Sequence, residues 1–294
     1  MAVVQAGSMG RAARQLHVAQ PNISNSVANL ERALGVRLLD RGRQGVAATP
    51  YGRAVIDCGV AIFDDLRQGL SKIRFLADPT AGEVRIGTTA FLAESFVSAV
   101  IDRVSKRYPR VSFHIVARPE TLRRELSERQ VDLLITRRFD YLADDQFDFE
   151  LLFHDPFVVA AGARNEWVRR RGYGLADLVK ERWVLPPPGM GPWSVALESF
   201  RKIGLDFSGP TVVADLPEVR IGLLATGRFL TIFPASVLKF PARREGIKVL
   251  RVELPVSSVP VGIVTLKNRT LSPVAQIFRE YVHDIAKPLT KQKG

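Results

Sequence analysis

The sequence predicts an all-α N-terminal part followed by a two-lobed α/β domain. Two patterns predict this arrangement. Up to residue 76, apolar residues recur mostly at helical intervals of three and four. From residue 83 onward, short apolar runs alternate with helical stretches, which is the pattern of strands that are connected by helices. The 294 residues and the hydrophobic content of 46% are enough for two or three domains with substantial cores.

The N-terminal part begins with two short helices joined by a tight turn. They are predicted over 9–17 and 21–34. Pro21 lies in the first turn of the second helix, where the missing N–H would have had no intrahelical acceptor. Gly35 then ends this helix. Its apolar residues are spaced by four, three and four, so we expect them to form one buried face. That face consists of Ile23, Val27, Leu30 and Leu34.

The opposite face of the second helix carries short polar side chains and almost no acid. Such a surface fits a DNA major groove, where these side chains reach the base edges. An ordinary amphipathic helix pair is the alternative interpretation. The residues predicted to bind DNA at the start of this helix and along it are Gln20, Pro21, Asn22, Ser24, Asn25, Asn29 and Arg32.

A basic segment with two glycines follows over 41–49 and predicts a hairpin, the wing. Its Arg41 and Arg43, together with Arg53, are expected to contact phosphates, which positions a protein on DNA without reading sequence. A solvated basic loop is the alternative. Thr49 is the candidate N-cap of the next helix, which has a proline at its first position.

That next helix, predicted over 50–76, has a heptad-like apolar seam. A lone helix between two domains would leave this seam in water, so we expect it to pack against a partner. Packing only on its own domain is the alternative. The predicted dimerisation residues are Ile56, Phe63, Leu66, Leu70 and Ile73.

A linker at 77–82 precedes the α/β part. The predicted strands cover 83–87, 111–116, 131–136, 151–161, 183–185, 210–213, 230–233, 248–253 and 260–266. The predicted helices cover 96–108, 122–129, 193–203, 218–226 and 272–285. Alternation of this kind implies a parallel sheet covered on both faces. The chain is expected to cross between lobes twice, so that lobe I comprises 82–157 and 260–290 and lobe II comprises 158–259.

Ligands of open parallel sheets lie beyond the carboxyl ends of the strands. The loop over 188–194 also exposes backbone N–H groups at a helix start, which favours an anion or a polar oxygen. These rules select a candidate set for a small-molecule effector. The set is Thr88, Thr89, Phe91, Arg118, Thr121, Thr136, Trp193, Ser194 and Phe233.

Three ordered motifs carry a family resemblance: AAxxLHVAQPxIS, LExxLGVRLLDR and TPYGR. Together they resemble the winged helix-turn-helix of the LysR-type transcriptional regulators, and the resemblance extends over essentially the whole chain. It implies a winged helix-turn-helix over 1–49, a linker and dimerisation helix over 50–76, and an effector-binding domain over 82–294 that is similar to periplasmic binding proteins. The implied partners are double-stranded DNA, a small-molecule effector and further copies of the chain, as a homodimer or homotetramer.

The sequence departs from this family at four places. Ala19 stands where members usually have a serine, Asn25 where they often have an arginine, and Phe91 where many have a serine or threonine. Residues 1–5 are all that remains of the first family helix. Two explanations stay open for this truncation: a misplaced start codon, or a domain that folds with a stub.

Composition limits the other function classes. A net charge of +12 suits a polyanionic partner, and equally an arginine-rich chain from a GC-rich genome. The single cysteine, Cys58, excludes an internal disulfide and fits a cytoplasmic protein. We expect no metal, cofactor, membrane span or enzymatic activity, because the histidines are scattered and no phosphate-loop or nucleophile motif occurs. A dimeric small-molecule-binding module without DNA binding is the alternative function.

Overall fold

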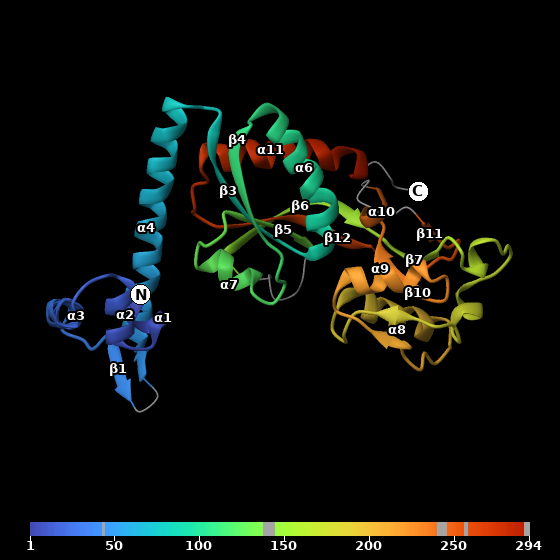
Figure 1. Cartoon of the computed structure of the whole chain (residues 1–294), viewed down its shortest axis with the longest axis horizontal. Coiled ribbons are helices and arrows are strands. Elements are labelled where there is room, and N and C mark those ends of the chain that lie inside the picture. The colour runs from blue at the N-terminus through green and yellow to red at the C-terminus, as the bar shows by residue number, and fades with distance from the viewer. Residues whose placement is uncertain (43–44, 138–144, 240–245, 256–257, 291–294) are drawn as a thin grey trace. The chain divides into compact units, whose positions relative to one another are not determined.

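The computed structural model describes residues 1–42, 45–137, 145–239, 246–255 and 258–290 (Figure 1). These residues belong to two compact units, Met1–Ile73 and Arg74–Gly294. Within the described ranges, no helix is long and apolar enough to cross a membrane.

The first unit is a small helical domain with a β-hairpin. Its elements are α1 (Ala2–Ala6), α2 (Met9–Gln15), α3 (Gln20–Leu34), β1 (Leu39–Gly42), β2 (Gly45–Ala48) and the long α4 (Pro50–Ala77). The small residues Ala12 and Ala13 are fully or almost fully buried, so α2 and α3 approach each other closely. The core of this domain consists of Val3, Met9, Ala12, Ala13 and Ile23.

Helix α2 ends two residues earlier than predicted, because a left-handed residue stops it. His17 has a φ of 53°. Its N–H donates to the Arg14 carbonyl over 3.3 Å, and the Val18 N–H donates to the Ala13 carbonyl over 3.0 Å. This pair of bonds is a Schellman motif, in which the left-handed position is usually a glycine.

The predicted buried face of α3 is only half correct. Ile23 is buried and Val27 is half-buried, but Leu30 and Leu34 are 43% and 49% exposed. These two leucines are exposed because the neighbouring helices are short. Helix α1 has five residues and α2 has seven, so they cover only the first half of α3. The second half of α3 therefore leaves an apolar edge in water.

Helix α4 begins and ends within one residue of the prediction, and Thr49 is its N-cap. The Gly52 N–H donates to Thr49 Oγ1 over 3.0 Å, and that hydroxyl donates to the Arg37 carbonyl over 2.7 Å. Gly52 is required for close packing, because a Cβ there would lie 2.0 Å from the Leu38 carbonyl oxygen. The start of α4 is thus fitted tightly against the segment that leads into β1.

Lobe I of the second unit is built on a five-stranded sheet of order β4-β3-β5-β12-β6. Its strands are β3 (Ala81–Thr88), β4 (Arg110–Val116), β5 (Leu133–Arg137), β6 (Phe147–Asp155) and β12 (Val259–Leu266). Only β4, β3 and β5 are parallel, and β12 runs antiparallel to both β5 and β6. The prediction of a parallel sheet was therefore wrong for β6 and β12. These two strands carry the chain between the lobes and need no helical crossover.

Helices cover both faces of this sheet (Figure 1). A π-helical stretch (Ala93–Val97) joins α5 (Ala90–Leu92) to α6 (Ser98–Arg107), so the chain is helical from residue 90 rather than from the predicted 96. Helices α6 and α11 (Pro273–Thr290) pack on one face, and α7 (Leu122–Ser127) packs on the other.

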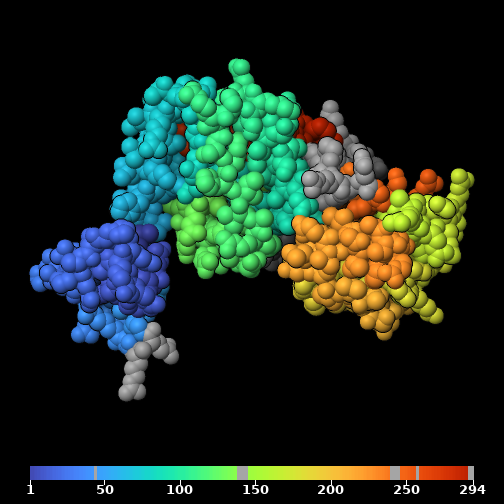
Figure 2. Space-filling model, viewed as in Figure 1, coloured from blue at the N-terminus to red at the C-terminus, as the bar shows by residue number. Residues whose placement is uncertain are grey.

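Lobe II contains the antiparallel sheet β10-β7-β11, made of β7 (Phe157–Gly162), β10 (Leu230–Pro234) and β11 (Ile247–Val249). A parallel pair, β8 (Val184–Leu185) and β9 (Val212–Val213), adjoins β10 through a bridge between Trp183 and Leu230. The helices are α8 (Gly191–Lys202), α9 (Pro217–Ala225) and α10 (Ser236–Lys239), with 3₁₀ turns at Glu166–Val168 and Leu175–Leu178. In Figure 2, lobe I is mainly cyan to green and lobe II is mainly yellow to orange.

The strand predicted over 151–161 is two strands, β6 and β7, in two different sheets. Pro156 lies between them and has no N–H to donate to a neighbouring strand. Strand β6 therefore ends before Pro156, and β7 begins after it. The strands predicted over 210–213 and 248–253 are real but shorter, at 212–213 and 247–249.

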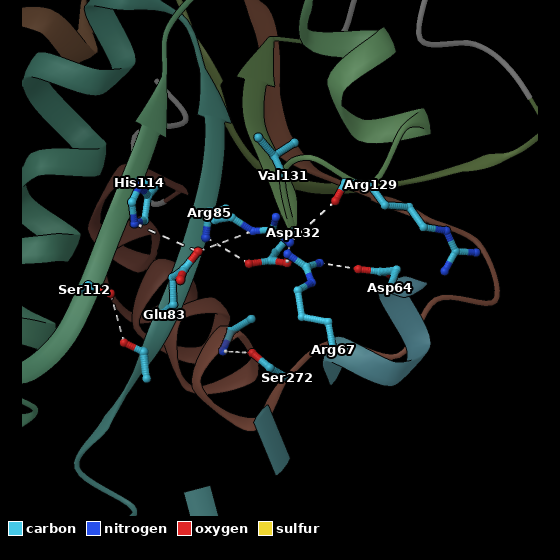
Figure 3. Close-up of polar contacts among 12 residues, drawn as sticks. Asp64, Arg67, Glu83, Arg85, Ser112, His114, Arg129, Val131, Asp132 and Ser272 are labelled. Atoms are coloured by element: carbon cyan, nitrogen blue, oxygen red, sulfur yellow. Dashed lines mark hydrogen bonds and ion pairs between the residues drawn. The ribbon is translucent and has the colours of Figure 1, made fainter. Parts of the chain in front are cut away.

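A buried ionic network fixes the amino end of β5 in lobe I. Asp132 accepts from the Arg85 backbone N–H over 2.9 Å and pairs with the Arg269 guanidinium over 3.1 Å. Figure 3 shows the Arg85 and Asp132 side chains facing each other, with Glu83 on the same strand as Arg85 and His114 on the neighbouring β4. The network ties the segment after β12 to the centre of the sheet, because Arg269 also donates to the Val131 carbonyl over 2.6 Å.

Candidate nucleic-acid interface and ligand cavity

The polar face of α3 is open to solvent. Ser24 is half-buried, and the other six predicted residues of this helix are exposed: Gln20, Pro21, Asn22, Asn25, Asn29 and Arg32. Asn29 and Arg32 are joined on this face, since Arg32 Nη1 donates to Asn29 Oδ1 over 3.0 Å. The first turn of α3 contains no acidic residue, so nothing there repels a phosphate from the positive end of the helix dipole.

Glu31 fixes the far end of α3 to the wing. Its Oε1 accepts from the backbone N–H groups of Leu38 over 2.7 Å and Leu39 over 3.2 Å. The bond from Leu38 is the main reason that the pKa of Glu31 lies below its ordinary value, and the charges of Arg41 and Arg37 add to it. At the other end of α3, Ala19 makes no side-chain cap, as its methyl side chain requires.

The wing forms as predicted, as the β1–β2 hairpin. Arg41 is exposed on β1, and Arg53 is exposed in the first turn of α4, where its Nη1 donates to the Ala48 carbonyl over 2.9 Å. Arg43 lies outside the described residues. The described basic residues of this region are thus accessible to a phosphate backbone.

The apolar seam of α4 is largely exposed in the single chain. Phe63 is 66% exposed and Ile73 is 64% exposed, and Leu66 and Leu70 are exposed as well. Ile56 is half-buried. Large apolar side chains in a row on one helix face favour a partner surface.

The second unit contains a cavity of about 530 Å³ between its two lobes. Three predicted effector residues line it: Thr89, Phe91 and Arg118. The other six do not line it: Thr88, Thr121, Thr136, Trp193, Ser194 and Phe233. For several of these the contacts explain why.

Thr88 is fully buried and its hydroxyl donates to the Ile135 carbonyl over 2.7 Å, so it serves the sheet. Thr121 Oγ1 bonds to the Arg118 carbonyl and to Glu125. Trp193 packs against the core of lobe II. Phe233 lies behind Phe91, with ring centroids 5.2 Å apart and the rings nearly perpendicular.

Two buried arginines line the cavity and were not among the predicted effector residues. Arg137, 7% exposed, ends β5, so the carboxyl-end rule applies to it as it does to Thr136. Arg220, 3% exposed, lies in α9 with its guanidinium 4.8 Å from the Phe91 ring centroid and 5.6 Å from that of Phe233. No sequence signal marks Arg220, because helical periodicity does not show that a charged residue is buried.

Arg137 also takes part in a buried junction of the lobes. Asp155 is 1% exposed and accepts from Arg137 Nη2 over 3.0 Å, from the Ser236 N–H over 2.9 Å and from Ser236 Oγ over 2.6 Å. Burial lowers the pKa of Arg137, and Asp155 partly offsets this effect. The three residues join the ends of β5 and β6 to the start of α10. In the described part of the chain, no group of three or more His, Cys, Asp or Glu residues is placed to hold a metal ion.

Two family models match the chain. "Bacterial regulatory helix-turn-helix protein, lysR family" matches residues 1–53, and "LysR substrate binding domain" matches residues 77–287. Among curated relatives, the transcriptional dual regulator GltC of Bacillus subtilis is 28% identical over 261 residues, covering 88% of this chain and 86% of its own. The uncharacterised HTH-type regulator YybE of the same organism is 26% identical over 275 residues, covering 92% and 91%.

Solved structures with the same fold span nearly the whole chain. A full-length OxyR variant from Pseudomonas aeruginosa has a TM-score of 0.67 at 21% identity, covering 100% of this chain and 96% of its own. Full-length CbnR complexed with its target DNA has a TM-score of 0.57 at 22% identity, covering 97% and 96%.

Proposed function

Since the chain belongs to the LysR family of bacterial transcriptional regulators, we propose that α3 reads base edges in a major groove and that the wing contacts the adjacent phosphates. The observation that carries this proposal is the exposed, acid-free polar face of α3, with Asn22, Asn25 and Asn29 open to solvent. CbnR, which shares the fold, is recorded in complex with its target DNA. Asn25 and Asn29 are the proposed base-reading residues, because an amide can bond an adenine edge bidentately.

The proposed phosphate contacts are Arg41, Arg43 and Arg53, with Arg32 at the rim of α3. These contacts fix the position of the protein and give no sequence preference. Each neutralised phosphate releases counterions, so binding weakens steeply as salt rises.

The cavity between the two lobes is the proposed effector site. Its volume of about 530 Å³ is that of a small-molecule pocket, and Thr89, Phe91 and Arg118 contribute to its lining. An effector changes regulation only if it binds one conformation of the protein more tightly than another. Residues of both lobes line the cavity, so a change in the angle between the lobes alters the contacts of a bound ligand. A ligand can therefore bind one arrangement of the lobes more tightly than another.

The exposed seam of α4 is the proposed dimer contact. Two chains paired through Phe63, Leu66, Leu70 and Ile73 would cover apolar area that the single chain leaves in water. A dimer presents two α3 helices to two half-sites, which multiplies the affinity of a weak single domain. Pairs of dimers give the tetramer that the sequence resemblance implies. As a DNA-binding regulator, the protein is assigned to the cytoplasm, without an enzymatic role.

Gel-shift titration tests the proposed DNA binding. The full chain is titrated against duplex from the region beside its own gene and against a shuffled duplex of equal composition, at several salt concentrations. The proposal predicts that both affinities fall with salt while the preference for the native duplex persists. Equal affinity for the two duplexes at every salt concentration would contradict it.

A further inference from the structure

The second unit carries more of the positive charge of the chain than the unit that contains α3 and the wing. Residues 74–294 contain 33 Lys and Arg and 25 Asp and Glu, whereas residues 1–73 contain nine and five. Most of this excess belongs to lobe II, because residues 158–259 contain 15 basic and nine acidic residues. The net charge of +12 is therefore not a property of the helix-turn-helix domain alone.

One end of the lobe II sheet is remote from the cavity. Strands β7 and β10 are antiparallel, and the paired residues Phe157 and Pro234 line the cavity. The other end of the same two strands is the pair Ala161 and Leu230. In Figure 1 the segment that follows β7, drawn in yellow-green, lies at this remote end of lobe II.

Exposed arginines from three separate segments lie at this remote end. Arg164 lies two residues after β7, and its Nη2 donates to the Ala225 carbonyl at the end of α9 over 3.0 Å. Arg228 lies two residues before β10. The Leu230 N–H donates to the Arg182 carbonyl over 2.9 Å, which places Arg182 beside the start of β10. The side chains of all three arginines are exposed.

Two further arginines follow a 3₁₀ turn that is fixed at the same place. Asn165 caps this turn, because its Oδ1 accepts from the Trp167 N–H over 3.0 Å. Its Nδ2 donates to the Gly227 carbonyl over 3.0 Å. Arg169 and Arg171 come directly after the turn and are exposed. We call the following set the distal basic patch: Arg164, Arg169, Arg171, Arg182 and Arg228.

None of the patch arginines forms an ion pair with a carboxylate of the described residues. The acids of the same segment have other partners or are half-buried. Glu166 pairs with Arg170 over 2.5 Å, and Asp177 accepts the Gly174 N–H over 2.8 Å. Glu181 is half-buried. Clustered like charges repel one another, and a bound polyanion would remove this repulsion.

A phosphate backbone is the polyanion that the patch fits best. A guanidinium can bind a phosphate through two parallel N–H bonds. All five arginines lie outside the helices and strands, so the patch has no element that could enter a groove and read bases. DNA bound through the first unit would also raise the concentration of phosphate near the second unit of the same chain.

We propose that the distal basic patch of lobe II is a second DNA contact, which binds the phosphate backbone of the duplex that α3 reads. This inference rests on the proposed DNA binding of the first unit. The patch adds affinity that does not depend on sequence, and it makes binding more sensitive to salt. It leaves the base preference of α3 unchanged, because phosphates carry no sequence information.

Salt-dependent DNA binding of the full chain tests this proposal. The patch variant carries Arg171→Gln and Arg228→Gln. The control variant carries Arg124→Gln and Arg251→Gln, which remove the same charge at exposed positions outside the patch. Gel shifts use a long duplex from the region beside the gene, at several salt concentrations.

The expected result is a change in slope without a change in preference. Each lost phosphate contact lowers the slope of log affinity against log salt by about 1, so the patch variant should lose about 2 and the control variant nothing. The ratio of affinities for the native and the shuffled duplex should be the same in all three proteins. Equal slopes in the three proteins, or the same loss in both variants, overturn the proposal.

A second probe separates DNA from an acidic protein as the partner of the patch. Binding of poly-L-glutamate is measured with the same three proteins. If the patch variant loses affinity for poly-L-glutamate but keeps the DNA salt slope of the unmodified chain, the patch recognises acidic protein segments and the proposed DNA contact is overturned. Circular dichroism checks that both variants are folded.

Failure of this inference is distinguishable from failure of the proposed function. Preference of the unmodified chain for the native duplex, together with equal salt slopes, removes the patch contact alone. A lower slope in the patch variant without any duplex preference in the unmodified chain supports the patch contact and removes the assignment of α3 as the reading helix.

Discussion

The carboxylate of Glu31 accepts the backbone N–H of Leu38 over 2.7 Å, and so joins the last turns of α3 to the first strand of the wing. The Leu39 N–H reaches the same oxygen over 3.2 Å. One side chain thus fixes the proposed reading helix relative to the proposed phosphate-contacting hairpin.

Glu31→Gln should loosen the wing and flatten its response to acid. The pKa of Glu31 is lowered in the folded state, chiefly by the Leu38 N–H. The ionised carboxylate therefore stabilises the fold above the pKa of the unfolded chain, and this contribution is lost as pH falls through the lower folded-state pKa. At neutral pH the variant should lose about 1 kcal/mol of the free energy that protects the wing from opening. The amides of residues 36–48 should then exchange roughly fivefold faster than in the unmodified chain.

Hydrogen exchange at pH 7 and at a pH well below 4.5, the ordinary pKa of a glutamate, checks this prediction. The unmodified chain should lose protection of the wing on acidification, after correction for intrinsic exchange, and the variant should change little. Equal pH dependence in the two proteins would show that Glu31 does not control the wing.

Gly52→Ala should destabilise the first unit by about 1–3 kcal/mol. The added methyl group would lie 2.0 Å from the Leu38 carbonyl oxygen and 3.3 Å from Ala48 Cβ, so α4 or the segment before β1 must shift. Gly69→Ala on the same helix is the matched control, because a Cβ there meets nothing within 4 Å. Thermal unfolding followed by circular dichroism should show a loss for the first variant and none for the second. A stable Gly52→Ala protein would refute this packing.

His17→Gly should stabilise the first unit by about 1 kcal/mol. His17 occupies the left-handed position of the Schellman motif after α2, which costs a residue with a Cβ but costs glycine little. Exchange of the amides of α2 and α3 should slow by roughly fivefold. Faster exchange in the variant would mean that the imidazole itself stabilises the turn.

Phe63→Glu should prevent self-association. Phe63 is 66% exposed in the centre of the α4 seam, and a carboxylate there would be buried against a second copy. Lys72→Glu, exposed on nearly the opposite side of the helix, is the control. Sedimentation velocity should give a monomer for the first variant and the unmodified assembly for the second. An unchanged assembly in Phe63→Glu would place the contact elsewhere.

The sequence predicts the ends of helices correctly where capping or helix-stopping residues determine them. Thr49 and Pro50 mark the start of α4, Gly35 ends α3, and the period change after residue 82 separates the helical part from the α/β part. Local chemistry did not reveal how far neighbouring elements reach. Leu30 and Leu34 have the spacing of buried residues, but the short helices beside them do not cover them.

The sequence predicts where the cavity lies, but it does not predict which residues line it. The carboxyl-end rule located Thr89, Phe91 and Arg118, because strand ends are visible in the sequence. It does not tell which residue of a strand end faces the ligand and which faces the sheet, so Thr88 and Thr136 were included and Arg137 was not. Arg220 lies against Phe91, which is more than a hundred positions away in the sequence, and no local pattern shows this contact.

Selection of binding sites from a random duplex pool, with the unmodified chain and with Asn25→Ala, tests the central claim most directly. If α3 reads base edges, the unmodified chain enriches a motif of two related half-sites. The variant then relaxes at one position in each half-site, at a cost of about 1–3 kcal/mol for the preferred base. Enrichment of no motif, or the identical motif from both proteins, would contradict the assignment of α3 as the reading helix.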